Sequence, residues 1–437
     1  MLPAPWCGVL AGLLLAWMPD PQFPSRFAPL TLSLTHIIAV AMLLPVMIGA
    51  LFQLFPVVAG QSIAAAKRIA PWVAISCFST ALCLSWGFFY SSRIAFISAG
   101  VIALLLLGST AIALFDAGRR MFPLLRVDAS LATLATISLP ISLLLLFALL
   151  MLSVLLSWLQ IDFMALLQAH VVWALVGLLA CLVGGVAATT VPMFWQTARP
   201  SRAWSRFWPC PVFILCAFVT LASMFEQFNM PLVSVLSILC GVGLIYLSLM
   251  LKNLLGARRR FDPAWPLWVA SVLSWMLAAV LCMLYVGRTY LTSLFQLPLL
   301  PLMPSSLSWE SMPWMIGVLV LIGGAVLPMN AMIGKIVPFL VFLHVRRAIP
   351  MGQKIPSMQM ILPPVFLRYQ ARLVLVSLCF AVLLPIAPSI LRWCAGLSFS
   401  ASQALLAIVL MRCLLSYRRQ IQINRSASTS AMHPSKL

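Results

Sequence analysis

The sequence predicts an all-α membrane protein with twelve transmembrane helices, and three observations lead to this prediction. Hydrophobic residues make up 63% of the 437 residues and charged residues only 8%, which is too little charge for a water-facing surface. The apolar residues gather in runs long enough to cross a bilayer. The basic residues gather in the short loops between the runs. This placement accounts for the net charge of +20, so we expect the lipid bilayer as partner and no binding of nucleic acid.

The apolar runs follow one another from the first residues almost to the C-terminus. A spanning helix needs about 20 residues, so the first run is marginal and several others are long enough to tilt. The first run has neither a basic start nor a small-residue cleavage site, so we interpret it as a helix and not as a signal peptide. The runs are 3–18, 29–58, 69–90, 94–115, 130–157, 164–195, 209–226, 231–254, 265–287, 312–343, 370–389 and 393–416.

The distribution of basic residues predicts the orientation of the chain. With the N-terminus inside, 22 of the 27 Lys and Arg residues fall in inner loops, and Lys335 lies within an apolar run. Such a bias is typical of cytoplasmic loops, so both termini are predicted to be cytoplasmic. Residues 1–416 form one twelve-helix domain, and the polar tail 417–437 is predicted to be disordered. The outer loops hold only Arg26, Arg93, Arg288 and Arg392.

A short pattern recurs at every fourth predicted helix. The segments are "GALFQLFP" (49–56), "GVAATTVP" (185–192) and "AMIGKIVP" (331–338). Each has a small residue seven positions before its proline, and the three prolines end the second, sixth and tenth predicted helices at the inner side. Period, depth and topology agree, so we predict three pseudo-symmetric arcs of four helices, at about 1–120, 121–260 and 261–416.

Each repeat also carries a polar residue three positions before its proline: Gln53, Thr189 and Lys335. These positions lie on nearly the same face as the proline. Lys335 is about two turns from the inner end, so we expect its side chain to snorkel to the membrane surface. A buried ion pair or a contact with a transported substrate is the alternative for Lys335.

Two of the four histidines occupy related positions. His36 lies 20 residues before the first repeat proline and His170 lies 22 residues before the second, so each is ~30 Å from its proline, near the outer side. An ionisable residue within a membrane is a functional candidate, and imidazole is a common ligand of haem iron and copper. The alternative is an imidazole that makes an interhelical hydrogen bond or lies at the membrane interface.

Other side chains offer weaker signals. Met329 and Met332 form an M-x-x-M pair, which suits copper, although methionines more often serve as flexible core filler. No carboxylate lies in the middle of an apolar run, which argues against proton-coupled transport.

The arcs, and the histidine followed by Gly-Ala and proline in the second helix, resemble the haem–copper oxidase subunit I superfamily. The likeness is greatest to its nitric-oxide-reductase-like members and to the NnrS family of bacterial haem- and copper-containing membrane proteins. It is specific only in the second, sixth and tenth helices. The resemblance implies that His36 corresponds to the low-spin haem b ligand and His170 to a copper ligand. It also implies residence in a bacterial inner membrane.

The sequence lacks several of the histidines that bind metal in that superfamily. The run 209–226 has no histidine, although the oxidases place two copper ligands there, and the tenth helix lacks the haem-ligating histidines. We therefore expect no reduction of oxygen or nitric oxide, and the sequence does not predict an enzyme. The leading hypothesis is a haem- or copper-holding protein of respiratory or nitric-oxide physiology. The alternatives are a transporter of an unknown small ligand and a structural partner of other membrane subunits.

Overall fold

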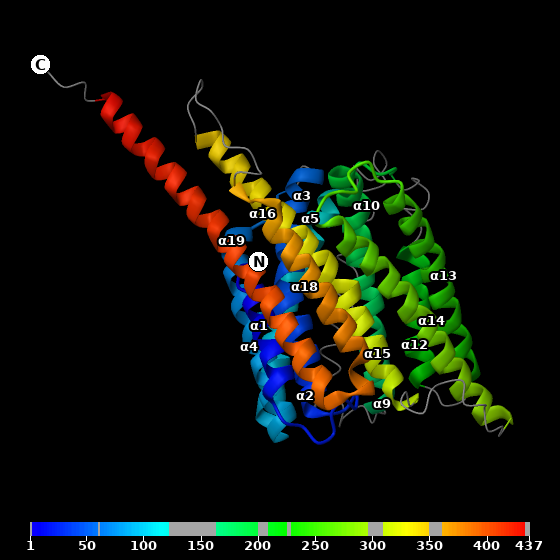
Figure 1. Cartoon of the computed structure of the whole chain (residues 1–437). Helices are drawn as coiled ribbons and strands as arrows, with labels where there is room; N and C mark the ends of the chain where they lie inside the picture. Colours follow the sequence, from blue (N-terminus) through cyan, green and yellow to red (C-terminus); the bar gives the residue numbers. More distant parts are fainter. Residues whose placement is uncertain are drawn as a thin grey trace, which may run out of the picture.

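The computed structural model describes residues 2–59, 62–121, 163–199, 209–224, 229–295, 309–348 and 361–432. The regular structure in these ranges is entirely helical, and the helices form one bundle with their axes roughly aligned (Figure 1). Helices are expected here because a bilayer offers no water to backbone N–H and C=O groups, and a helix satisfies them within its own segment.

The helices differ in length and in how they continue into one another. In chain order they are α1 (Ala4–Trp17), α2 (Pro29–His36), η1 (Ile37–Leu43), α3 (Leu44–Ala59), α4 (Ala66–Tyr90), α5 (Arg93–Met121), α9 (Phe163–Val172), η3 (Trp173–Ala180), α10 (Cys181–Trp195), α12 (Pro209–Met224), α13 (Asn229–Leu255), α14 (Trp265–Phe295), η5 (Trp309–Ser311), α15 (Met312–Val318), η6 (Leu319–Val326), α16 (Leu327–Ala348), α18 (Pro364–Leu383), η7 (Leu384–Ile386) and α19 (Pro388–Met432).

The described part of the chain holds nine helices that are long and apolar enough to cross a membrane. Two further apolar helices, Ala4–Trp17 and Pro211–Ala222, are shorter. Together they coincide with every predicted run except 130–157, which lies outside the described residues. The chain is thus a multi-pass membrane protein, and the regular structure of its described residues is helical.

The end of the chain differs from the expectation. Disorder was predicted from residue 417, but α19 continues as a helix to Met432. Figure 1 shows it projecting well beyond the other helices. The extension begins with Arg418, Arg419, Gln420 and Gln422, which favour helix, so an already formed helix can propagate into it.

Among the described residues, three long helices share an unusual backbone. In each, a π-helical segment interrupts the α-helix: η1 joins α2 to α3, η3 joins α9 to α10, and η6 joins α15 to α16. Each π-helical segment begins 19 residues before a repeat proline (37 to 56, 173 to 192 and 319 to 338). π-Helical turns are rare and are frequent at functional sites. Because each π-helical segment lies at the same distance from its repeat proline, the sequence repeat is accompanied by a repeated backbone conformation.

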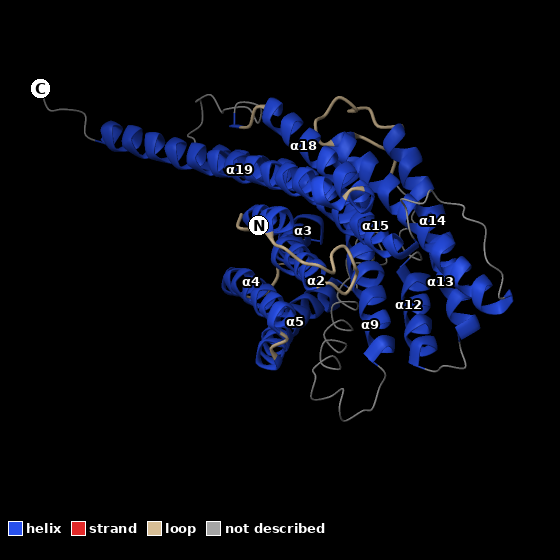
Figure 2. Cartoon of the chain, turned by 60° about the horizontal axis from the view of Figure 1, so that its bottom comes forward, coloured by secondary structure: helices blue, strands red, loops and turns tan. Residues whose placement is uncertain are grey.

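The three π-helical segments meet within the bundle, since η6 contacts both η1 and η3. The helices run in the same direction, with α2, α9 and α15 at one end and α3, α10 and α16 at the other (Figure 1). We call the first the histidine end and the second the proline end. Figure 2 brings the histidine end forward, and α2, α9 and α15 are again neighbours. The helix that contains η6 is the most buried of the described spans.

The wide turns of η6 are stabilised from α14. The Gly324 carbonyl accepts hydrogen bonds from the Trp275 indole at 3.0 Å and from the Ser271 hydroxyl at 3.3 Å. A Cβ at Gly324 would lie 2.6 Å from Cε2 of Trp275 and nearer still to its Nε1, so only glycine permits this approach. The two donors satisfy a carbonyl inside a membrane helix.

Replacement of Trp275 by Phe keeps the aromatic bulk but removes the shorter hydrogen bond. We expect a loss of about 1 kcal/mol in the free energy of unfolding, measured by thermal or denaturant unfolding in detergent. Trp86→Phe is the control, because the Trp86 side chain is exposed. Equal stability of the two variants would contradict this role of Trp275.

The first and last helices pack through small residues. Gly8 and Gly12 of α1 face α19, where a Cβ at Gly12 would lie 2.5 Å from the Gly396 carbonyl oxygen and would also collide with Ser400. The Ser400 hydroxyl donates a hydrogen bond of 2.9 Å to the Val9 carbonyl. Small residues four apart let membrane helices approach closely, which explains how short α1 is fixed to the bundle.

Candidate functional site

The loop before α2 fixes the position of His36. Asp20 accepts hydrogen bonds from the Gln22 and Leu30 backbone N–H groups, both at 2.9 Å. A carboxylate at a helix N-terminus satisfies free N–H groups and interacts favourably with the helix dipole. Helix α2 therefore starts at a defined point, at Pro29, and places His36 two turns further, immediately before η1.

The hydrogen bond of His36 determines its tautomer. Nδ1 lies 2.8 Å from the Leu32 carbonyl oxygen, and a carbonyl can only accept, so Nδ1 carries the proton. In the neutral imidazole, Nε2 then keeps its lone pair, which is the form that binds a metal ion. The ring is partly buried and lies 5.1 Å from the Phe88 ring, with the planes inclined by 43°.

His170 lies in α9 and is also partly buried. Both belong to the histidine end of the bundle, His36 as the last residue before η1 and His170 shortly before η3. The two histidines that the sequence singled out thus lie at the same end of two of the π-interrupted helices.

The third π-containing helix has a glycine at the corresponding level. Gly317 lies 21 residues before Pro338, between the spacings of 20 and 22 residues for His36 and His170. A Cβ at Gly317 would meet no heavy atom within 4 Å, whereas Gly323 and Gly324 of the same helix are tightly packed. Gly317 is partly exposed, so the space beside it is open to the surface of the described bundle.

The methionine pair does not join this site. Met329 and Met332 are buried in the hydrophobic core, and Met329 lies only nine residues before its repeat proline. This register places it about 16 Å further from the histidine end than the imidazoles. Asn330 between them is 1% exposed, and neither polar atom of its amide has a hydrogen-bond partner among the described residues. Sequence reasoning weighed the methionines and missed this amide.

Lys335 is paired, in contrast to the expected snorkelling. Its Nζ forms an ion pair with Asp262 Oδ2, and the two side chains are 18% and 19% exposed. The other oxygen of Asp262 accepts the Ala264 backbone N–H at 3.0 Å. The two residues are 73 positions apart in the sequence. Asp262 lies between the predicted runs 231–254 and 265–287, in a loop on the same inner side as the nearby end of the Lys335 helix, and this shared side is the signal for the pair.

The other two polar repeat positions have different surroundings. The Gln53 side chain is exposed. Thr189 is partly buried, and its hydroxyl oxygen has no hydrogen-bond partner within the part of the chain that is described. Corresponding places in the repeat thus hold an exposed amide, an unpaired hydroxyl and an ion-paired ammonium group.

The described side chains restrict which groups the histidines can hold. No set of three His, Cys, Asp or Glu residues suitable for a metal ion occurs within them. Haem iron takes four nitrogens from the porphyrin and needs only axial ligands from the protein. Copper(I) accepts low coordination numbers and binds imidazole.

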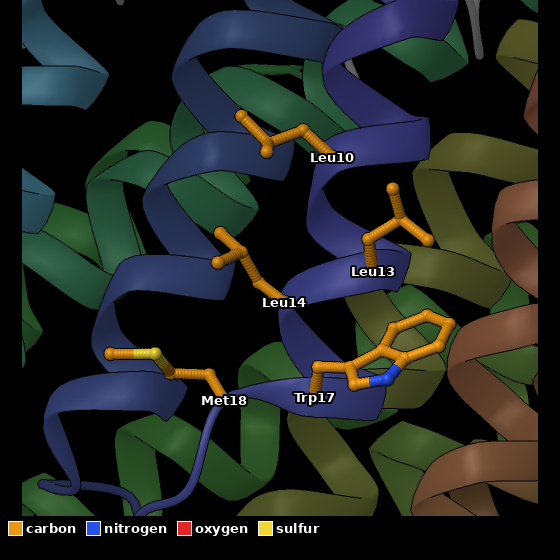
Figure 3. A pocket seen from close by; sticks show the side chains of 5 residues that line it. All are labelled: Leu10, Leu13, Leu14, Trp17 and Met18. Atoms are coloured by element: carbon orange, nitrogen blue, oxygen red, sulfur yellow. The ribbon is translucent and has the colours of Figure 1, made fainter.

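Another hollow on the surface lies away from the histidines and is lined by apolar side chains. A cavity of about 490 Å³ lies beside α1 and is lined by Leu10, Leu13, Leu14, Trp17 and Met18 (Figure 3). All five side chains are apolar apart from the indole N–H of Trp17. The hollow has the character of a lipid-facing surface and not of a reaction site.

Within the described residues these features define the class of protein: a helical, multi-pass membrane protein with three π-interrupted helices and with His36 and His170 at one end of the bundle. In comparisons with known proteins, no family model and no curated protein matches the chain.

Proposed function

We propose that the chain is a divergent relative of haem–copper oxidase subunit I that holds one haem b or copper through His36 and His170. In this proposal twelve helices form three arcs, both termini are cytoplasmic, and the protein resides in a bacterial inner membrane. Its role lies in respiratory or nitric-oxide physiology, as a storage, assembly or sensing protein and not as a working oxidase.

The observation that carries the proposal is the placement of the two imidazoles. Each lies within three residues of a π-helical segment, in two of the three helices that meet inside the bundle. The free lone pair on His36 Nε2 suits a ligand.

The equal spacing of π-helical segments and prolines supports the threefold arrangement, since one structural unit repeated three times produces it. A bound haem or copper supplies a site for a small ligand such as nitric oxide, or for one electron. In this proposal the chain holds the group. The Leu32 carbonyl orients the His36 imidazole, and the Phe88 ring packs beside that imidazole.

The test is the visible spectrum and the metal content of the full-length protein purified from its native membrane. We expect a haem absorption band or about one copper per chain, lost in His36→Ala. The control is His344→Ala, because His344 has the same 2.8 Å contact from Nδ1 to the carbonyl four residues earlier but lies near the proline end.

A folded wild-type protein that is colourless and free of copper would contradict the proposal. A His36→Ala variant that keeps the full haem or copper content of the wild type would also contradict it. The first result favours the transporter, whose path would include Gln53, Thr189 and Lys335, or the structural partner. The ion pair of Lys335 with Asp262 already neutralises the one cation of that path.

A further inference from the structure

A second site lies at the proline end, between the start of α18 and the C-terminal half of α19. A hollow of about 400 Å³ lies there. Its lining includes the apolar residues Leu362, Phe366 and Val409, which we call the floor. It also includes the polar residues Arg412, Ser416 and Arg419, which we call the rim. The candidate spans Pro364–Ile386 and Pro388–Arg419 both have an end here, so the hollow lies at the membrane boundary.

The three rim residues all belong to helix α19, and its geometry places them in a row. Arg412, Ser416 and Arg419 follow the i, i+4, i+7 spacing, which places two guanidinium groups and a hydroxyl along one face of α19. Arg412 lies over the Phe366 ring, 5.4 Å from its centroid, so this guanidinium is held at the edge of the apolar floor. Arg419 lies two turns further along α19.

The lining of this hollow contains no Asp or Glu, and the whole sequence has none after Glu310. Arg412 and Arg419 are exposed, so their guanidinium groups are accessible to an anion from outside the chain. Guanidinium groups pair strongly with phosphate oxygens, and basic pockets between membrane helices on the cytoplasmic side suit anionic headgroups.

We propose that this hollow binds an anionic phospholipid, with its phosphate at Arg412, Ser416 and Arg419 and an acyl chain along Leu362, Phe366 and Val409. The combination of a charged rim and an apolar floor requires a ligand with both characters, and the surrounding membrane supplies one. This inference is independent of the histidine site.

The experiment uses the delipidated full-length protein in detergent, with bound lipid counted by native mass spectrometry. We expect phosphatidylglycerol to bind at least about tenfold more tightly than phosphatidylcholine. Arg412→Gln/Arg419→Gln is expected to remove that preference. Arg418→Gln is the matched control, an exposed arginine on the same helix that does not line the hollow, and it is expected to bind as the wild type.

Two further measurements complete the test. Leu415→Trp fills the hollow from its exposed side without changing charge, and we expect it to reduce phosphatidylglycerol binding even if the double variant does not fold. Inorganic phosphate is expected not to displace the lipid at equal concentration. The proposal is overturned by equal binding of the two lipids, by unchanged binding in Leu415→Trp or in the folded double variant, or by displacement by phosphate.

Discussion

Gly12→Leu is expected to cause the largest loss of stability of any single substitution considered for this protein. At Gly12 even a Cβ would lie 2.5 Å from the Gly396 carbonyl oxygen, which belongs to the backbone and cannot rotate away. Helix α1 must therefore move off α19, and its other contacts there, including the hydrogen bond from Ser400 to Val9, are weakened. We expect a loss of about 3 kcal/mol or more in the free energy of unfolding.

The measurement is denaturant or thermal unfolding in detergent, followed by circular dichroism. Gly241→Leu is the matched control, because a Cβ at Gly241 would meet nothing within 4 Å in the membrane helix α13. Gly12→Ala is expected to fall between the two. If Gly12→Leu unfolds at the same point as Gly241→Leu, the close packing of α1 on α19 is wrong.

Lys335→Met is expected to cause the second largest effect. The substitution removes the cation that neutralises Asp262, whose side chain is only 19% exposed, and leaves a largely buried carboxylate unpaired. Breaking one side of such a pair is costly, and we expect about 3 kcal/mol. The double variant Lys335→Met/Asp262→Asn removes both charges, so it is expected to recover most of this loss.

A double-mutant cycle in detergent measures the coupling between the two residues. Arg119→Gln is the control, since Arg119 is 73% exposed and lies 3.5 Å from Asp116, and such exposed pairs contribute less than about 1 kcal/mol. Additive effects of Lys335→Met and Asp262→Asn would show that the two charges do not stabilise one another.

Much of the fold was predictable because the membrane imposes a simple requirement. A run of apolar residues must become a helix, so the predicted run 69–90 closely matches α4 (Ala66–Tyr90), and 3–18 matches α1 (Ala4–Trp17). Where polar residues follow, apolarity no longer marks the end of a helix. That is why α19 extends to Met432, past the predicted end at 416.

The candidate site was predictable only in part. The positions of His36 and His170 followed from their spacing to the repeat prolines, because helix rise converts residue number into depth. The π-helical segments beside them were not predictable, since apolar residues pack well in either helix type. The partner of Lys335 lies 73 residues away, so only the folded chain reveals it. Whether these side chains hold a group stays a prediction.

The most direct test of the account is the metal or haem content of His36→Ala, His170→Ala and the double variant, each compared with the wild type. If His36 and His170 share one haem or copper, each single variant is expected to lose that group. The double variant is then expected to have the same content as the single variants. Losses that add up, or a wild-type protein that contains no haem and no copper, would contradict the shared site.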